Sequence, residues 1–115
     1  MFEEKLKYEM QNRKKYMVLG VEERTCYLQD LETNNIFYIN VYFRKVQKLP
    51  QDKDLIYVPN QMQKEIKTGQ KNFSFSGEIG EVFARKPHDF SVCPEEFLIV
   101  EYSSGERVLI ERIYG

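Results

Sequence analysis

One group of side chains in this chain has the residue types needed for thiol catalysis. Cys93, His88 and Asp89 lie within six residues, and a cysteine nucleophile needs a nearby base and a group that orients the base. Pro87 and Pro94 bracket the segment, so we expect a loop there. Catalytic triads are defined by geometry and not by closeness in sequence. The pattern therefore favours an ordinary loop over the site of a thiol hydrolase.

A second group has the residue types that bind Mg²⁺ in nucleases. Glu65 and Lys67, with Asp52 or Asp54 upstream, resemble the acidic residue and the Glu-x-Lys with which PD-(D/E)xK nucleases hold the cation and orient water. In that class the Glu-x-Lys lies on a strand, whereas residues 61–66 have a helical pattern here. A three-residue match is also frequent by chance. The helical surroundings argue against a metal-dependent hydrolase.

The C-terminal part contains glutamates from which the carboxylate pair of a glycoside hydrolase could be drawn: Glu95, Glu96, Glu101, Glu106 and Glu111. Glu101 and Glu111 alternate with apolar residues, which is typical of the solvent-facing side of a strand. Gly77, Gly80 and Lys86 lack the spacing of a phosphate-binding loop. We therefore predict a protein that is not an enzyme, with a small hydrolase as the second alternative.

Cysteine and histidine are scarce in this chain. Cys26 and Cys93 are its only cysteines and His88 is its only histidine, so a zinc site of Cys and His ligands within one chain is excluded. Two reduced, buried thiols are the favoured state in a cytoplasmic chain, and a single disulfide is the alternative. We predict no metal and no cofactor.

A predicted strand over residues 36–43 would carry a polar aromatic row, because alternate residues of a strand face opposite sides. The side chains expected to face the core are apolar: Phe37, Ile39, Val41 and Phe43. The side chains expected on the other face are Tyr38, Asn40 and Tyr42. Tyrosines suit a protein partner because they give contact area at low entropy cost, and they also stack on nucleobases. The third interpretation is that an N-terminal helix covers this face.

The formal net charge of −1 excludes a uniformly basic nucleic-acid binder and a uniformly acidic tail. The charge is uneven, however: residues 44–71 carry +4 and residues 72–115 carry −4. The basic side chains expected to meet an acidic protein or phosphates are Arg44, Lys45, Lys48, Lys64, Lys67 and Lys71. Tyr57 is the aromatic residue of this segment. A solvated loop is the alternative, and the scarcity of Arg disfavours phosphate recognition.

The first half of the chain predicts a helix followed by strands. Residues 2–16 place Phe2, Leu6 and Met10 on one helical face. Residues 16–43 predict a three-stranded antiparallel meander with breaks at 23–24 and 32–35, and Gly20 within it predicts a bulge or bend.

The second half begins with a basic segment over residues 44–71, which holds a strand at 55–58 and a short helix at 60–67. Residues 72–114 predict further strands at 72–76 and 81–84 and a final hairpin of 97–102 with 107–113. We expect a four-residue connection in this hairpin. Tyr102 would then oppose Arg107, Val100 would oppose Leu109, and Ile99 would oppose Ile110.

Length and composition agree with one small domain. The chain has 115 residues and 13.8 kDa, eight Tyr, eight Phe and a single Ala, which favours sheet over helix. We predict a mainly β (α+β) fold over 1–115: a small antiparallel barrel-like domain, oligonucleotide-binding-like or SH3-like. An N-terminal helix would precede it, and one short helix would lie between strands 3 and 4.

These observations favour a non-enzymatic binding module whose partner is another protein, such as a small inhibitor or immunity protein of a phage or mobile element. A nucleic-acid-binding barrel is the alternative, and pairing of two copies through the uneven charge is a further expectation. The charged start lacks the apolar stretch of a signal peptide, and no apolar run reaches the roughly 20 residues of a membrane span. We therefore expect a cytoplasmic protein with no membrane partner.

Overall fold

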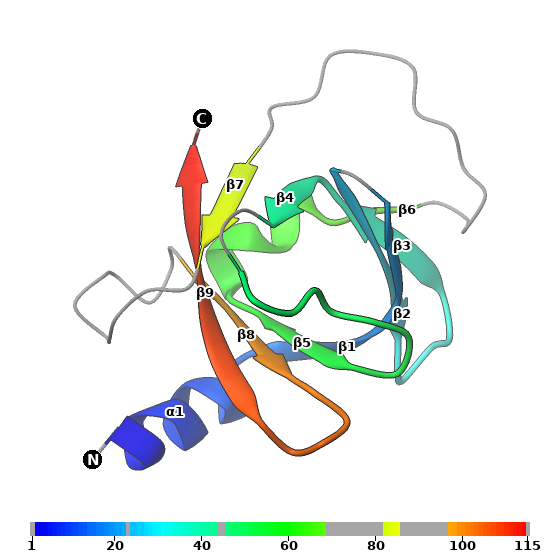
Figure 1. Cartoon of the computed structure of the whole chain (residues 1–115). Helices are drawn as coiled ribbons and strands as arrows, with labels where there is room; N and C mark the ends of the chain where they lie inside the picture. Colours follow the sequence, from blue (N-terminus) through cyan, green and yellow to red (C-terminus); the bar gives the residue numbers. More distant parts are fainter. Residues whose placement is uncertain (1, 23, 44–45, 69–81, 86–96, 115) are drawn as a thin grey trace.

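In the described part of the chain, an α-helix precedes a sheet (Figure 1). The computed structural model describes residues 2–22, 24–43, 46–68, 82–85 and 97–114. The helix is α1 (Phe2–Gln11), and a short 3-10 helix is η1 (Asn60–Glu65). The strands are β1 (Lys14–Glu22), β2 (Thr25–Asp30), β3 (Ile36–Ile39), β4 (Val41–Phe43), β5 (Leu55–Val58), β6 (Lys67–Thr68), β7 (Val82–Arg85), β8 (Phe97–Glu101) and β9 (Arg107–Tyr114).

The described strands form one sheet in the order β4-β7-β9-β8-β5-β1-β2-β3-β6. Adjacent strands are antiparallel, except for the parallel pair β4 and β7. The mainly β architecture and the antiparallel meander of β1, β2 and β3 are confirmed. The sheet is not closed into a ring, so the oligonucleotide-binding-like or SH3-like barrel stays a prediction.

Helix α1 ends at Gln11 and not at residue 16 as the sequence predicts. The Asn12 side chain donates a hydrogen bond to the Tyr8 carbonyl at 2.9 Å, and the Arg13 N–H donates to the Met10 carbonyl at 3.4 Å. The chain then enters β1, whose residue Lys14 is opposite Val58 of β5. A short helix is only marginally stable without a surface to pack on. The last residues of the predicted helix pair with β5 instead, and they therefore belong to the sheet.

The register of β1 against β2 shifts between Val18 and Gly20, which confirms the predicted irregularity. Val18 is opposite Leu28, whereas Gly20 is opposite Tyr27. The extra residue is a bulge, and bulges increase the local twist of a strand. It also keeps both Val18 and Val21 against the core, because it resets the alternation of the strand.

The larger apolar core is built from strands that lie far apart in the strand order. Its buried members are Tyr16, Val18, Cys26, Leu28, Ile39, Val41, Phe43, Ile56, Val58, Met62, Leu98, Val100, Tyr102 and Ile110. Val41 and Phe43 come from β4 at one end of the order, and Ile39 comes from β3 near the other end. A flat sheet could not bring these side chains into one cluster, so the sheet curves around this core.

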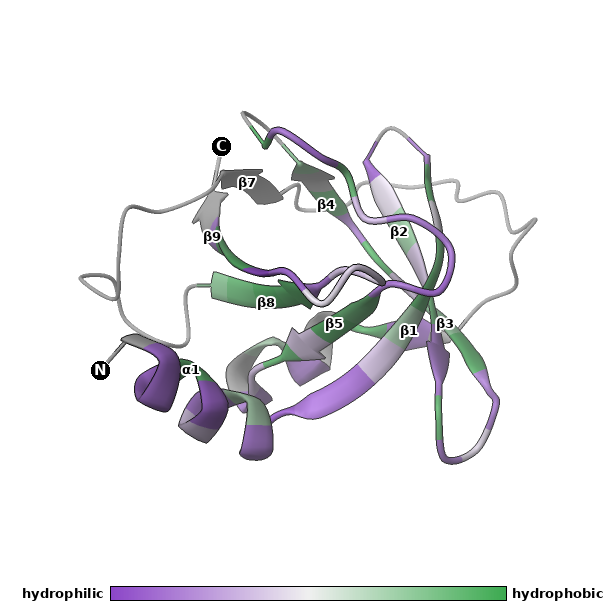
Figure 2. Ribbon diagram, turned by 60° about the horizontal axis from the view of Figure 1, so that its bottom comes forward, coloured by the Kyte–Doolittle hydropathy of each residue, from purple (hydrophilic) through white to green (hydrophobic). Residues whose placement is uncertain are grey.

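A second, smaller core joins α1 to the other face of the sheet (Figure 2). Leu6 is buried against a group from β5, β8 and β9: Tyr57, Phe97, Ile99 and Leu109. Burying one leucine contributes about 1.5–3 kcal/mol. In Figure 2 the hydrophobic colour covers β8, whereas most of α1 is hydrophilic, in agreement with a helix that buries a narrow stripe.

The C-terminal hairpin forms with a register that differs by one residue from the predicted one. Glu101, and not Tyr102, is opposite Arg107, and Ile99 is opposite Leu109. Gly105 N–H donates to the Tyr102 carbonyl at 2.8 Å, and Gly105 has a φ of 93°. The connection is therefore a three-residue loop with a left-handed glycine, which moves every pair by one position relative to a four-residue loop.

The predicted strand over 36–43 is divided at Asn40 into β3, which pairs with β2, and β4, which pairs with β7. The predicted helix over 60–67 is the shorter η1, and its last predicted residue lies in β6. The predicted strand over 81–84 is β7, which starts one residue later, at Val82. The predicted strand over 72–76 lies outside the described residues.

Candidate functional site

Two loops that are far apart in sequence meet at one end of the sheet. The first comprises residues 46–54 between β4 and β5, and the second comprises residues 102–106 between β8 and β9. In Figure 1 the first loop passes across the front of the curved sheet, towards β5. We call these two loops together the loop platform.

Tyr102, in the second loop, makes a side-chain hydrogen bond to the backbone of the first loop. Its hydroxyl donates a hydrogen bond to the Lys48 carbonyl at 2.6 Å, and its ring belongs to the larger core. Burial raises the pKa of the Tyr102 phenol, and the charges of Glu106 and Asp54 act in the same direction. The phenol therefore stays protonated at neutral pH and keeps its proton available for the Lys48 carbonyl.

Asp54 makes the second connection between the loops. One carboxylate oxygen accepts a hydrogen bond from the Gln51 N–H at 2.8 Å, and the other accepts one from the Ser103 N–H at 2.9 Å. The residue is 3% exposed. A buried carboxylate is costly unless its oxygens are paired, and here both oxygens have backbone donors.

Backbone hydrogen bonds attach the same loop to β1. The Lys53 N–H donates to the Val18 carbonyl at 2.9 Å, and the Val18 N–H donates to the Asp54 carbonyl at 2.7 Å. Lys53 has a φ of 76°, an uncommon left-handed conformation for a residue other than glycine. The surrounding bonds hold that conformation, so the loop has one defined backbone path.

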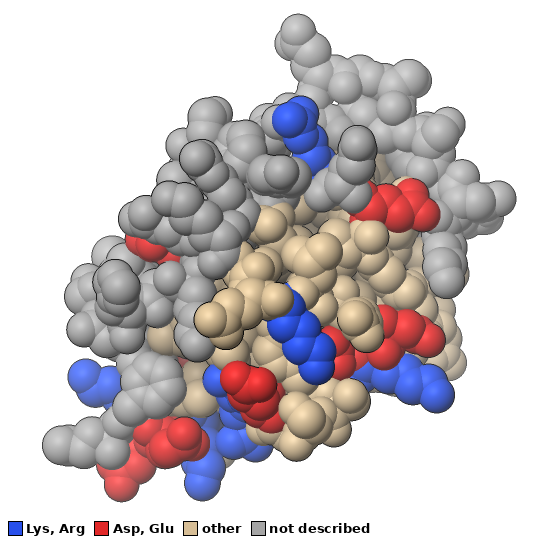
Figure 3. All heavy atoms as spheres, viewed as in Figure 1, with Lys and Arg blue, Asp and Glu red and all other residues tan. Residues whose placement is uncertain are grey.

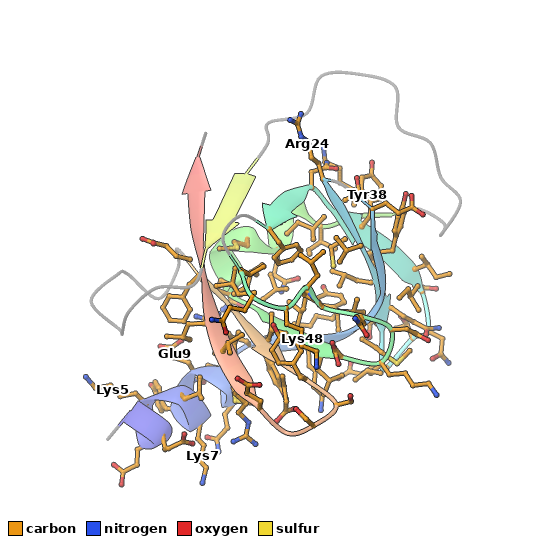
Figure 4. The ribbon with its side chains drawn as sticks, in the orientation of Figure 1. Lys5, Lys7, Glu9, Arg24, Tyr38 and Lys48 are labelled. Carbon is orange, nitrogen blue, oxygen red and sulfur yellow. The ribbon has the colours of Figure 1, made fainter. Side chains whose placement is uncertain are left out.

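The loop platform presents an exposed apolar side chain within a polar surface. Leu49 is 46% exposed, although the neighbouring Pro50 is buried. The exposed polar and charged members are Gln47, Lys48, Gln51, Asp52, Lys53, Ser103, Ser104 and Glu106. Figure 3, in the same orientation as Figure 1, shows mostly uncharged side chains in the middle of the described surface, crossed by a basic side chain where Figure 4 labels Lys48.

Lys48 is the one predicted binding residue that the structure places on this platform. Its ammonium lies 4.8 Å from the centre of the Tyr102 ring, and cation–π contacts of this kind orient a cation. Among the described residues, no carboxylate forms an ion pair with it. The ammonium is therefore held in place and remains available to a further anion.

The two members of the predicted polar aromatic row whose side chains the structure describes, Tyr38 and Asn40, are buried. Tyr38 faces away from the larger core as expected, opposite Tyr27 of β2 and Lys67 of β6, but it is 3% exposed. Asn40 is also buried, and its side-chain oxygen accepts a hydrogen bond from the Thr25 hydroxyl at 3.4 Å. The expectation that α1 covers this face is wrong, because Leu6 packs on the other core.

The other predicted binding residues whose side chains the structure describes do not gather around Lys48. Tyr57 is buried under α1, and its hydroxyl donates to Glu101 at 3.0 Å. Lys67 is exposed on β6 beside Tyr38, at a distance along the sheet from the platform. Three predicted residues lie outside the described residues: Arg44, Lys45 and Lys71. Two more lie on described elements, but their side chains are not described: Tyr42 and Lys64.

The hydrolase patterns do not assemble in the described residues. Asp54 uses both oxygens within the platform, and Asp52 is exposed. Glu101 binds Arg107 at 2.7 Å, whereas Glu111 is opposite Phe97 at the far end of the hairpin. Four strand positions separate the two glutamates, roughly 13 Å, which is wider than a glycosidase pair. The Cys93, His88 and Asp89 group lies outside the described residues, as do Glu95 and Glu96.

The Cys26 thiol, which the structure describes, lies in an environment that disfavours its reactive thiolate form. Cys26 is buried in the larger core, and burial raises its pKa to about 12. Within the described ranges, no three Cys, His, Asp or Glu side chains are grouped closely enough to hold a metal ion. The same ranges contain no helix with the length and apolar character needed to cross a membrane.

Sequence patterns identified Lys48 as a binding residue, Asp54 only as a metal-binding carboxylate and Tyr102 only as a hairpin residue, and they gave no role to Leu49. A signal for Asp54 exists, since a turn-rich segment with two aspartates precedes a strand and Asp side chains commonly bind backbone N–H groups. No local pattern indicates that Ser103 is the second donor, because the two loops meet only when β5 pairs with β8. Comparison of the chain with protein-family models, with curated proteins and with solved structures finds no match.

Proposed function

We propose that this protein is a non-enzymatic binding module that contacts a partner protein through the loop platform. The observation that supports the proposal most directly is the exposure of Leu49 on a loop whose backbone is held by Tyr102 and Asp54. Ordering a loop on binding costs free energy, and a loop that is already ordered avoids this cost. Rigid loops on a sheet scaffold are also a common place for binding residues.

A protein is favoured over a nucleic acid by the burial of two tyrosines. Single-stranded nucleic acids bind through exposed aromatic rings beside basic side chains. Tyr38 and Tyr57 are buried, and the hydroxyl of Tyr57 is bound to an acidic side chain. The rings of Tyr38 and Tyr57, which the nucleic-acid-binding alternative requires for base stacking, are therefore not exposed for that purpose.

The barrel-like architecture belongs to the same proposal. Only Asn40 separates β3 from β4, and these strands pair with β2 and β7 respectively. One extended segment therefore connects strands near both ends of the sheet order. Such a small, curved sheet would provide a rigid base for the loops at its end.

The proposal can be tested with a matched pair of leucine variants. Leu49→Asp places a charge on the platform, and Leu31→Asp places the same charge at a similarly exposed leucine, 43%, just after β2. Both variants should retain the stability of the wild type within about 0.5 kcal/mol, because both side chains are exposed. The immobilised wild type and both variants are then incubated with a lysate of the source organism.

A protein retained by the wild type and by Leu31→Asp, but lost from Leu49→Asp, supports the proposal. Retention of the same proteins by all three forms would contradict it, as would the absence of any retained protein. Binding of single-stranded oligonucleotides that weakens steeply with salt would favour the nucleic-acid alternative instead.

A further inference from the structure

Arg13, Lys14 and Lys48 each touch an aromatic ring, and they differ in their second contact. Arg13 lies 4.7 Å from the Phe97 ring and also contacts the Glu9 carboxylate at 3.4 Å. Lys14 lies 5.6 Å from the Tyr16 ring and also contacts Asp30 at 2.8 Å. Lys48 contacts the Tyr102 ring and, among the described residues, forms no ion pair with a carboxylate.

The carboxylates of the platform do not neutralise Lys48. Asp54 is buried, and both of its oxygens accept backbone hydrogen bonds. Asp52 and Glu106 are exposed on the two loops, and neither forms an ion pair with Lys48. Because these two carboxylates would repel a run of acidic residues, the platform is suited to a ligand with one carboxylate and not to a polyacidic one.

The residue that follows Lys48 in the chain is an exposed apolar one. Leu49 follows Lys48 in the chain, and the Lys48 carbonyl between them is held by the Tyr102 hydroxyl at 2.6 Å. One buried tyrosine therefore restricts Lys48 both at its ammonium, through the ring, and at the carbonyl that precedes Leu49, through the hydroxyl. A ligand that uses both side chains needs a carboxylate and an apolar group at neighbouring positions.

We infer that the platform binds an extended peptide segment of its partner in which a single Asp or Glu adjoins a large apolar side chain. The carboxylate pairs with Lys48 and the apolar side chain covers Leu49. This inference rests on the proposed function, because it names the chemistry of the partner at the same surface.

The experiment uses a displayed library of random linear peptides, selected against the whole wild-type domain. The enriched peptides are then synthesised, and their dissociation constants are measured for the wild type and for four variants. Lys48→Gln removes the ammonium and Lys48→Glu reverses its charge. Lys7→Glu is the control for charge reversal, on the exposed face of α1, and Leu49→Asp reports whether a peptide binds the platform.

We expect the enriched peptides to contain one acidic residue beside Leu, Ile, Phe, Met, Trp or Tyr. Lys48→Gln should weaken their binding by up to about fivefold and Lys48→Glu by more, because an exposed ion pair contributes up to about that factor. Lys7→Glu should change the dissociation constant by less than about twofold. Added salt should weaken binding to the wild type and should have little effect on Lys48→Gln.

Other results would overturn the inference in distinguishable ways. Peptides that are lost with Leu49→Asp, but are neutral or basic and insensitive to Lys48→Glu, would refute the partner chemistry and leave the proposed function standing. Peptides that bind all variants equally would refute both. If no peptide is enriched, the inference of an extended segment fails, and the lysate experiment decides the proposed function independently.

Discussion

The carboxylate of Asp54 accepts a hydrogen bond from the backbone N–H of Ser103 at 2.9 Å, although 49 positions separate the two residues. This contact connects the loop before β5 to the loop after β8. The strands themselves pair through Leu55, which follows Asp54, and Glu101, which lies two residues before Ser103. The contact therefore extends the β5–β8 pairing into the loops, and it makes the two loops one rigid surface.

Replacement of Asp54 should show that this contact stabilises the protein. Asp54→Ala removes the acceptor for two backbone N–H groups in a buried place, and hydrogen bonds to charged groups contribute about 1.5–3 kcal/mol each. We expect the free energy of unfolding to fall by about 2–4 kcal/mol in urea denaturation. Asp52→Ala, an exposed neighbour, should change it by less than about 0.5 kcal/mol. Equal effects of the two variants would contradict the assignment.

Arg13 should be the residue that fixes the end of α1 against the sheet. Its guanidinium donates to the Phe97 carbonyl at 2.8 Å, and its side chain is buried. Hydrogen bonds to charged groups contribute about 1.5–3 kcal/mol, so Arg13→Ala should lower the free energy of unfolding by about 2–3 kcal/mol.

Amide hydrogen exchange locates that effect. In Arg13→Ala, exchange should accelerate first in α1, since Leu6 and Met10 are its other described attachments to the sheet. Lys15→Ala, an exposed cation two residues later, is the control. Faster exchange in β2 and β3 with unchanged exchange in α1 would show that the role assigned to Arg13 is wrong.

The ion pair of Lys14 and Asp30 should make stability sensitive to acid. The hydrogen bond from Lys14 lowers the pKa of the Asp30 carboxyl, and the N–H groups of Glu32 and Thr33 lower it further. A carboxyl with a lower pKa in the folded state stabilises that state at pH values above its unfolded pKa. This contribution is lost as the pH falls below about 4.

Urea denaturation of the wild type and Asp30→Asn between pH 2 and pH 7 measures this contribution. The wild type should have the higher urea midpoint at pH 7, and the difference should decrease as the pH falls through the pKa of Asp30. Glu32→Gln, in the exposed turn, should follow the wild type at each pH. A difference between wild type and Asp30→Asn that is independent of pH would exclude the ionic contribution.

Tyr57 should ionise later than an ordinary tyrosine. Burial raises the pKa of its phenol to about 12, and its hydrogen bond to Glu101 acts in the same direction. Because the folded pKa is above the unfolded value, the stabilisation is complete below about pH 10 and is lost as the pH rises towards 12. Absorbance titration near 295 nm should show a late-titrating tyrosine that is missing from Tyr57→Phe. An unchanged titration curve in this variant would contradict the prediction.

Cys26 should be inert in the folded protein. A buried thiol whose pKa is raised to about 12 has almost no thiolate at neutral pH, and the thiolate is the nucleophile. In a Cys93→Ser variant we expect negligible reaction with iodoacetamide at pH 7.5 in buffer and rapid reaction in urea. Mass spectrometry measures both rates, and rapid alkylation without urea would show that the thiol is accessible.

The pattern of alternation along the strands predicted much of the fold correctly. Ile39, Val41 and Phe43 are core residues as expected, and Phe37 packs against them. The break at residues 32–35 is a turn, in which Asn34 has the left-handed φ of 63° that asparagine tolerates. These features depend on residues that are close in sequence, so local propensity is sufficient to identify them.

The candidate site was less predictable, because exposure depends on neighbours from distant parts of the chain. Alternation placed Tyr38 away from the larger core, but it could not show that this side chain would be buried. Lys48 was selected only as part of a basic segment, and the structure adds the Tyr102 ring that orients it. The register of the last hairpin also differed, because a three-residue loop with Gly105 replaced the expected connection.

The sequence by itself determined a mainly β domain with an N-terminal helix, an antiparallel meander and a C-terminal hairpin, since periodicity and turn residues act over short distances. Only the tertiary structure decided that α1 lies on Tyr57 and not on Tyr38, and that Asp54 meets Ser103. Both outcomes follow from the pairing of β5 with β1 and β8, which lie far from β5 in the chain. Such long-range pairing depends on how all the apolar faces can be buried together, and no local segment contains that information.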